Sequence, residues 1–257
     1  MIRYMLVLGL LVVGCTKKGG GDAELTKALA AAPNYKPVCE ALKIEIDKVC
    51  GAGADCAVKD AAAANNVMNV LDKTPYLQKV DVDLLNQFLS IKEPSKTDVS
   101  MGTAIIGRDC WSIMLVKPWK GLLGATKAKV KGLDKSRLQK SFRERVFLMD
   151  QNLPNYLKLS LKFVLVKEAV ADGLFKMSAE GKQPLVELEN KLKAVRASLN
   201  QEYGQAFKGA EGQAADPDPE KAKYDPAVVS AIMKKELQAA QVLSGEVNTW
   251  ITKYLTD

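Results

Sequence analysis

The sequence predicts an all-α fold: an irregular bundle of helix hairpins that ends in a long antiparallel helix pair. Apolar residues recur at spacings of three and four along most of the chain, which is the period of one helix face. Proline, glycine and capping residues such as aspartate stand where these patterns begin and end. The one run that alternates like a strand, Leu157–Val166, continues without a break to Gly173, which is long for a strand.

The first half of the chain contains a series of predicted helices, each bounded by a helix-breaking or capping residue. They are a short Ala-rich helix Asp22–Ala32 that Pro33 ends, Pro37–Cys50, Asp55–Lys73 with Asp55 as its N-cap, Val82–Ile91 with Asp81 as its N-cap, and Asp98–Val116, which stops before Pro118. Both cysteines of Pro37–Cys50 fall on its apolar face, so we expect them to face the core.

Two amphipathic or apolar segments follow. Asp134–Gln151 is predicted to be an amphipathic helix, with its basic residues largely off the apolar face. We interpret the segment from Pro154 to Gly173 as a buried central helix, because proline and glycine stand at its two ends. A strand over Leu157–Val166 is the alternative.

The last two helices are predicted over Pro184–Lys208 and Pro226–Leu255, joined by an exposed loop at 209–226 that is rich in Gly, Ala, Asp and Pro. Their apolar spacing favours packing against each other as an antiparallel hairpin. A coiled-coil partner is the alternative, but the repeats are few.

The chain has no histidine among its 257 residues. Histidine is the usual general base and the commonest metal ligand near neutral pH, so a Ser-His-Asp or Cys-His arrangement is excluded within this chain. A hydrolase that depends on carboxylates needs no histidine and stays open. The acidic residues of the late loop, Asp216, Asp218, Glu220 and Asp225, lack the order of an EF-hand loop. We therefore predict no metal, no cofactor and no enzyme activity.

The first fifteen residues place one basic residue, Arg3, before an apolar run from Tyr4 to Val13, and Gly14 and Cys15 follow. The run has ten residues, whereas a membrane-spanning helix needs about 20. This order of charge, apolar core and small residue resembles the signal peptide of bacterial lipoproteins, with Val12-Val13-Gly14-Cys15 in the place of the lipobox. An ordinary secretory signal with a chance cysteine is the alternative.

The resemblance implies that the signal peptide 1–14 is cleaved and that Cys15 carries a diacylglyceryl group, often with a further acyl chain such as palmitate. Two or three chains anchor a protein stably on a membrane. Residues 15–21 then form a lipidated tether, of which Thr16–Gly21 reaches roughly 13 Å, and 22–257 form a single helical domain. We expect a lipid-anchored cell-envelope protein. Because Thr16 is not the aspartate that commonly marks retention in the inner membrane, we expect the outer membrane, on its periplasmic or surface face, in a Gram-negative organism.

Four cysteines follow Cys15, and an even number in an exported protein indicates two disulfides. Cys39 and Cys50 are eleven residues apart on one predicted helix, which separates their Cα atoms by about 16 Å and excludes a disulfide between them. We predict the pairs Cys50–Cys56 and Cys39–Cys110. Free buried thiols are the alternative, and the spacing does not favour zinc.

The strongest charge feature is Lys117–Arg145, where ten basic residues stand against two acidic ones, a net charge of +8. The candidate polyanion contacts are Lys127, Lys129, Lys131, Lys135, Arg137, Lys140 and Arg143. Such a cluster can bind anionic lipid head groups or another polyanion. A solvated helix face next to a basic loop is the alternative. Nucleic acid is not expected, because no row of stacking aromatic residues is interleaved with the basic ones.

From these observations we expect a membrane-anchored envelope lipoprotein that acts as a non-enzymatic protein-interaction or assembly module for a protein partner. Binding of an anionic envelope component, lipid phosphate or wall polymer, through Lys117–Arg145 is the second hypothesis. The third is a histidine-free hydrolase that uses carboxylates.

Overall fold

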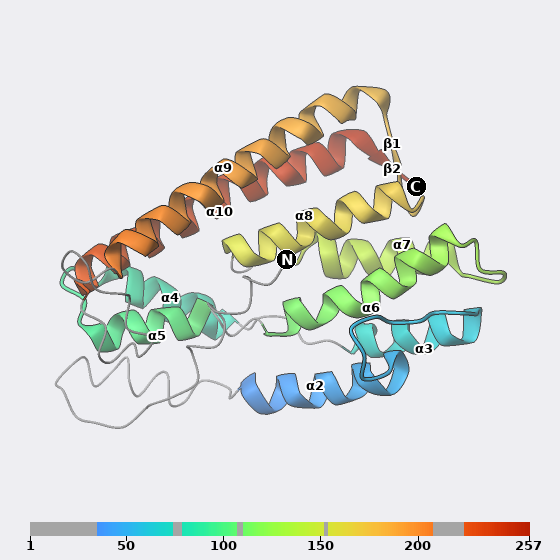
Figure 1. Ribbon diagram of the computed structural model, residues 1–257, viewed down its shortest axis with the longest axis horizontal. Coiled ribbons are helices and arrows are strands. Elements are labelled where there is room, and N and C mark those ends of the chain that lie inside the picture. Colours follow the sequence, from blue (N-terminus) through green and yellow to red (C-terminus); the bar gives the residue numbers. More distant parts are fainter. Residues whose placement is uncertain (1–34, 74–78, 107–109, 152–153, 208–223) are drawn as a thin grey trace. The chain divides into compact units, whose positions relative to one another are not determined.

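Figure 1 shows the computed structural model of the chain, which describes residues 35–73, 79–106, 110–151, 154–207 and 224–257. Within these ranges the side chains of 35–38, 79–81, 104 and 110–113 are not described. The all-α prediction is confirmed, because the described residues are helical apart from turns and two short strands. The signal peptide, the tether, the helix expected at Asp22–Ala32 and most of the loop 209–226 lie outside the described residues.

The described residues form two compact units, and each is considered by itself. Unit 1 contains residues 79–106, 194–207 and 224–238, and unit 2 contains 35–73, 110–151, 154–193 and 239–257. The helices α9 (Lys182–Ala206) and α10 (Pro226–Tyr254) each contribute residues to both units. The single domain expected over 22–257 stays a prediction.

Unit 2 is built around α6 (Cys110–Lys127), which contacts α2 (Tyr35–Cys50), α3 (Ala61–Asp72) and α8 (Tyr156–Ala171) (Figure 1). The remaining elements of unit 2 are α7 (Lys135–Phe142), the π-helical turn η1 (Arg143–Phe147), the antiparallel strands β1 (Lys176–Met177) and β2 (Leu255–Thr256), and the 3₁₀ turn η2 (Ala179–Gly181), besides its parts of α9 and α10.

Four aromatic rings form the centre of the unit 2 core. Trp119 lies edge to face against Phe142 with ring centroids 4.9 Å apart, and Phe142 contacts Phe147 and Phe175 in the same way. Edge-to-face contacts are a favoured arrangement for aromatic pairs. The π-helical turn explains how Phe142 and Phe147, five residues apart, are both buried, because its extra residue per turn brings them nearer to one face than a regular helix would.

The prediction that a helix stops before Pro118 is wrong, since α6 runs through this proline to Lys127. Proline removes one backbone donor and disfavours a helix interior. The cost is offset by packing, because Leu115, Trp119, Leu122 and Leu123 keep the three- and four-residue spacing across Pro118 and are all buried. The helix expected over Asp98–Val116 is instead divided between α5 (Lys96–Ile106) and α6.

The predicted start of the helix at Asp55 is also wrong. α3 begins at Ala61, and the side chain of Asp60 accepts the capping hydrogen bond from the Ala63 amide at 2.8 Å. Asp55 lies instead in the exposed loop that the Cys50–Cys56 disulfide closes. Closing this short loop holds residues 51–55 outside any helix, so the next capping aspartate starts α3.

The segment that alternates like a strand is a helix, as we predicted. α8 runs over Tyr156–Ala171, and the side chain of Asn155 caps it by accepting from the Lys158 amide at 2.9 Å. Even the lysines at 158 and 162 are buried, so α8 is buried around most of its circumference. An apolar helix of this kind shows no clear amphipathic period, which explains the alternation.

The helix predicted over Asp134–Gln151 is shorter than expected: α7 ends at Phe142 and passes into η1. Asp134 is its N-cap and accepts from the Arg137 amide at 2.9 Å. In unit 1, α4 (Lys79–Ser90) begins before Asp81, so the prediction that Asp81 is its N-cap is wrong.

Unit 1 packs α4 against α5, with Phe88 of α4 fully buried. Ser95 and Asp98 form a reciprocal capping box at the start of α5: the Ser95 amide donates to Asp98 Oδ2 at 2.7 Å and the Asp98 amide donates to Ser95 Oγ at 3.2 Å. The unit 1 parts of α9 and α10 run antiparallel, because Tyr203 donates to Glu236 and the ring of Phe207 contacts that of Tyr224.

Candidate functional site: the cationic turn

The basic segment extends along α6, the turn after it, α7 and η1, and most of its cations have protein partners. Acidic residues from outside the segment form ion pairs with five of them: Lys117 with Asp47, Lys120 with Glu168, Lys127 with Asp172, Arg137 with Asp72 and Arg143 with Asp257. Lys140 pairs with Glu144 inside the segment at 4.0 Å. The net charge of +8 in the sequence therefore overstates the charge that this surface offers to a ligand.

Arg137 holds α7 against α3. Its guanidinium donates to Asn65 at 3.2 Å, to Asn69 at 2.7 Å and to Asp72 at 2.9 Å. These acceptors stand four and three residues apart, so they lie along one face of α3. The donors of this predicted polyanion contact are thus occupied by the protein itself.

Arg143 is engaged in a similar way. It donates to Asp257 at 2.6 Å, and its guanidinium lies over the rings of Phe147 and Phe175 at 5.5 and 5.0 Å. Stacking of arginine on aromatic rings adds to the ion pair. Arg145 donates to the backbone carbonyl of Asp72 at 2.6 Å. All three arginines of the segment therefore bind protein groups.

The remaining cations gather between α6 and α7. Lys129, Lys131 and Lys135 are exposed and form no ion pair with any described residue. Lys127 stands next to them, and its side chain is 73% exposed although it pairs with Asp172 at 3.4 Å. We call residues 127–135 the cationic turn. Of the seven predicted polyanion contacts, the structure brings four together here and directs the other three to acidic partners.

The backbone of the cationic turn is unusual at Lys129, which has a φ of +53°. Its amide donates to the Thr126 carbonyl at 3.0 Å and the Val130 amide donates to the Ala125 carbonyl at 3.1 Å. This pair of bonds is the Schellman motif that ends many helices, in which glycine usually takes the left-handed position. The same motif ends α8 with Gly173, at a φ of +81°.

A left-handed lysine costs free energy that a glycine avoids, roughly 1–2 kcal/mol. A lysine near a helix C-terminus interacts favourably with the helix dipole, but Lys127 already provides a cation in the last turn of α6. A non-glycine residue in this conformation is a reason to look for a function. This position is occupied by one of the three lysines of the turn that form no ion pair with the residues that the structure describes.

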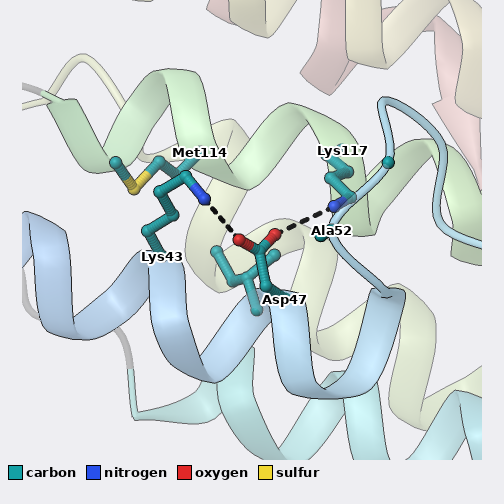
Figure 2. A pocket seen from close by; sticks show the side chains of 7 residues that line it. Lys43, Asp47, Ala52, Met114 and Lys117 are labelled. Atoms are coloured by element: carbon teal, nitrogen blue, oxygen red, sulfur yellow. Dashed lines mark hydrogen bonds and ion pairs between the residues drawn. The ribbon is translucent and has the colours of Figure 1, made fainter.

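A second cluster of charges lies between α2 and α6 (Figure 2). Figure 2 shows Asp47 between Lys43 and Lys117. These side chains border a small cavity of about 190 Å³, which is also lined by Ile46, Ala52, Gly53 and Met114. Hydrogen bonds from Lys43 and then Lys117 hold the pKa of Asp47 below its ordinary value. Lys117 also donates to the Gly51 carbonyl at the end of α2. Since these charges satisfy one another, the cluster fastens α2 to α6.

Unit 2 also contains a buried ion pair that the sequence did not suggest. Lys162 of α8 is 0% exposed and donates to Asp150 Oδ1 at 2.7 Å and to Asn248 Oδ1 at 2.5 Å. Ser244 donates to the other oxygen of Asp150 at 2.5 Å. Burial lowers the pKa of Lys162, and Asp150 acts in the opposite direction. The signal in the sequence was the lysines at 158 and 162, one helical turn apart within an apolar run.

The cysteines agree with the prediction as far as they are described. Cys50 and Cys56 form a disulfide. Cys39 is also disulfide-bonded, while the side chain of Cys110, its predicted partner, lies outside the described side chains. The pairing Cys39–Cys110 therefore stays a prediction. The lipidation site Cys15 lies outside the described residues.

No described helix is long and apolar enough to cross a membrane. Among the described residues, no group of three or more Cys, Asp or Glu side chains is placed to hold a metal ion. Comparison with protein-family models, with curated proteins and with solved structures finds no match to the chain.

Proposed function

We propose that this protein is a membrane-anchored, non-enzymatic envelope lipoprotein whose helical body binds an anionic envelope component through the cationic turn. The observation that carries the proposal is the distribution of ion pairs within Lys117–Arg145. Acidic residues of the protein neutralise the cations on either side, whereas Lys129, Lys131 and Lys135 are exposed and have no acidic partner among the described residues. The left-handed backbone at Lys129 supports the same conclusion.

The expected strength of this interaction follows from the number of free lysines. Each basic residue held at an anionic surface contributes about 1 kcal/mol, so three lysines change the affinity by a factor of roughly 100. Screening limits the field to about 8 Å at physiological ionic strength. Binding should therefore be specific for anions and should weaken as salt is added.

The binding experiment uses the full-length protein in detergent and fluorescent polyphosphate as the probe. We compare the native protein with a triple variant in which Lys129, Lys131 and Lys135 are glutamine. The matched control replaces three exposed lysines elsewhere in unit 2, Lys176, Lys182 and Lys253, by glutamine. We expect the affinity to fall with salt in the native protein and in the control. The triple variant should bind much more weakly and with a shallower salt dependence, since fewer counterions are released.

Equal loss in the two triple variants would mean that only total charge matters, and the cationic turn would then not be the site. The competing function is a protein-interaction or assembly module. Cross-linking in intact cells separates the two, because a protein partner that is captured equally well by the cationic-turn variant favours the competing function.

The anchor is tested separately. Cells grown with an alkyne analogue of palmitate should label the native chain, and substitution Cys15→Ser should abolish the label and release the protein from the membrane fraction. If the Cys15→Ser protein were still cleaved to its mature form and still found in the membrane fraction, lipidation at Cys15 would be contradicted. This experiment does not depend on what the cationic turn binds.

A further inference from the structure

We infer that the anionic component bound by the cationic turn is the phosphate layer of the bilayer that holds the lipid anchor. This inference rests on the proposed function and names the ligand of the same site. Three features support this inference: the lysines of the turn are exposed, the neighbouring arginines bind protein groups while three of these lysines form no ion pair with a described residue, and apolar residues lie between the lysines.

The cationic turn is open to solvent along its length. Residues 127–129, 131, 132 and 134–136 are all exposed, and Val130 and Leu133 are half-buried. None of the lysine side chains is recessed among other groups. A site that selects one phosphate group surrounds it with donors, whereas a row of exposed cations suits an extended surface that carries many phosphates.

The segment divides its two kinds of cation by role. Arg137, Arg143 and Arg145 all bind protein groups, and the three cations of the segment that lack a partner in the described part of the chain are all lysines. Arginine presents a rigid fork that fits one carboxylate or phosphate in two places, while lysine is a mobile point charge on a flexible stem. Mobile point charges suit a fluid surface on which no phosphate has a fixed position.

Val130 and Leu133 lie among the lysines and remain partly exposed. An apolar side chain next to a lysine suits a membrane interface, because the apolar atoms enter the head-group boundary while the ammonium stays at the phosphates. A soluble polyanion offers no apolar layer for these two residues. The proposed lipid on Cys15 and the short tether after it would keep the protein close to such an interface.

The experiment uses the full-length lipidated protein in vesicles of phosphatidylcholine, with or without phosphatidylglycerol. An amine-acetylating reagent that does not cross membranes modifies the exposed lysines, and mass spectrometry measures the extent at each position. We expect anionic vesicles to slow the modification of Lys129, Lys131 and Lys135 by about fivefold or more. Lys176, Lys182 and Lys253 serve as internal controls whose modification should not change.

Added salt should restore the modification, because the interaction is electrostatic. A second arm adds soluble polyphosphate to the zwitterionic vesicles. Protection by polyphosphate without protection by anionic vesicles overturns this inference and leaves the proposed function standing. Absence of protection in both arms overturns both. Protection that is equal at the control lysines overturns the inference as well, since it would show only that the whole body approaches the vesicle.

Discussion

Replacement of Lys162 by methionine should destabilise unit 2 strongly, because it removes one half of a buried ion pair. Lys162 and Asp150 are 0% and 1% exposed in their side chains, and their charged atoms are 2.7 Å apart. Methionine keeps much of the volume of the lysine stem and removes the ammonium. Asp150 then keeps only the hydroxyl of Ser244 among the partners that the structure shows, and Asn248 loses a donor.

The magnitude follows from the burial of both side chains. Breaking a buried pair by removing one partner costs about 3–5 kcal/mol, because the partner left behind is an uncompensated buried charge. This loss is a large part of the free energy of about 5–15 kcal/mol that stabilises a typical domain.

Urea unfolding followed by tryptophan emission suits this measurement, because all three tryptophans of the chain belong to unit 2. The matched control is Lys191→Met, which breaks the ion pair with Glu246 between two partly exposed side chains, 55% and 37% exposed. Exposed pairs contribute about 0–1 kcal/mol. The double variant Lys162→Met/Asp150→Asn should recover at least half of the lost stability. A loss below about 1 kcal/mol for Lys162→Met at neutral pH would refute this account of the pair.

Three further outcomes can be measured by the same unfolding methods, with far-UV circular dichroism for unit 1. Gly121→Ala should destabilise unit 2 by about 1–3 kcal/mol, because the new Cβ would lie 2.5 Å from the Cys56 carbonyl oxygen. The control Gly124→Ala, with nothing within 4 Å of the new atom, should be neutral or stabilising. Equal changes in the free energy of unfolding for the two variants would contradict the clash at Gly121. Lys129→Gly should stabilise unit 2 by about 0.5–1 kcal/mol, since relief of the left-handed strain exceeds the entropy that glycine adds to the unfolded chain. The same substitution should weaken anion binding. A loss of stability would count against backbone strain at Lys129. Burial raises the pKa of Glu236 above its ordinary value of 4.5, although Tyr203 donates to it. The folded state therefore holds the Glu236 proton more tightly than the unfolded state does, and stability falls as the pH rises through and above 4.5. Glu236→Gln should remove this part of the pH dependence of stability. An unchanged pH profile would show that Glu236 is not its source.

The helical class and the place of several elements could be predicted from local patterns. α8 lies where proline and glycine punctuation indicated a helix, and α9 and α10 lie close to their predicted bounds. The predicted disulfide Cys50–Cys56 is present. These features depend on spacing along the chain and on short-range geometry, both of which a sequence displays directly.

The errors came where packing overrides a local preference. Pro118 indicated a helix end, but the buried residues on both sides of it continue α6. Asp55 is a good capping residue in the wrong place, because the disulfide loop takes it out of the helix. Both outcomes depend on contacts with residues outside the local window.

The sequence by itself determined the net charge of Lys117–Arg145, the absence of histidine from the chain and the helical spacing of its apolar residues. Only the tertiary structure decided which of the cations are free. Asp47, Asp72 and Asp257 lie far from the basic segment along the chain, and folding brings each of them to a basic partner. Because charges interact through space, and salt screens these interactions beyond about 8 Å, the sum of charges along a segment does not give the charge of a surface. The structure reduced seven candidate contacts to a turn of four neighbouring lysines, of which three have no acidic partner among the described residues.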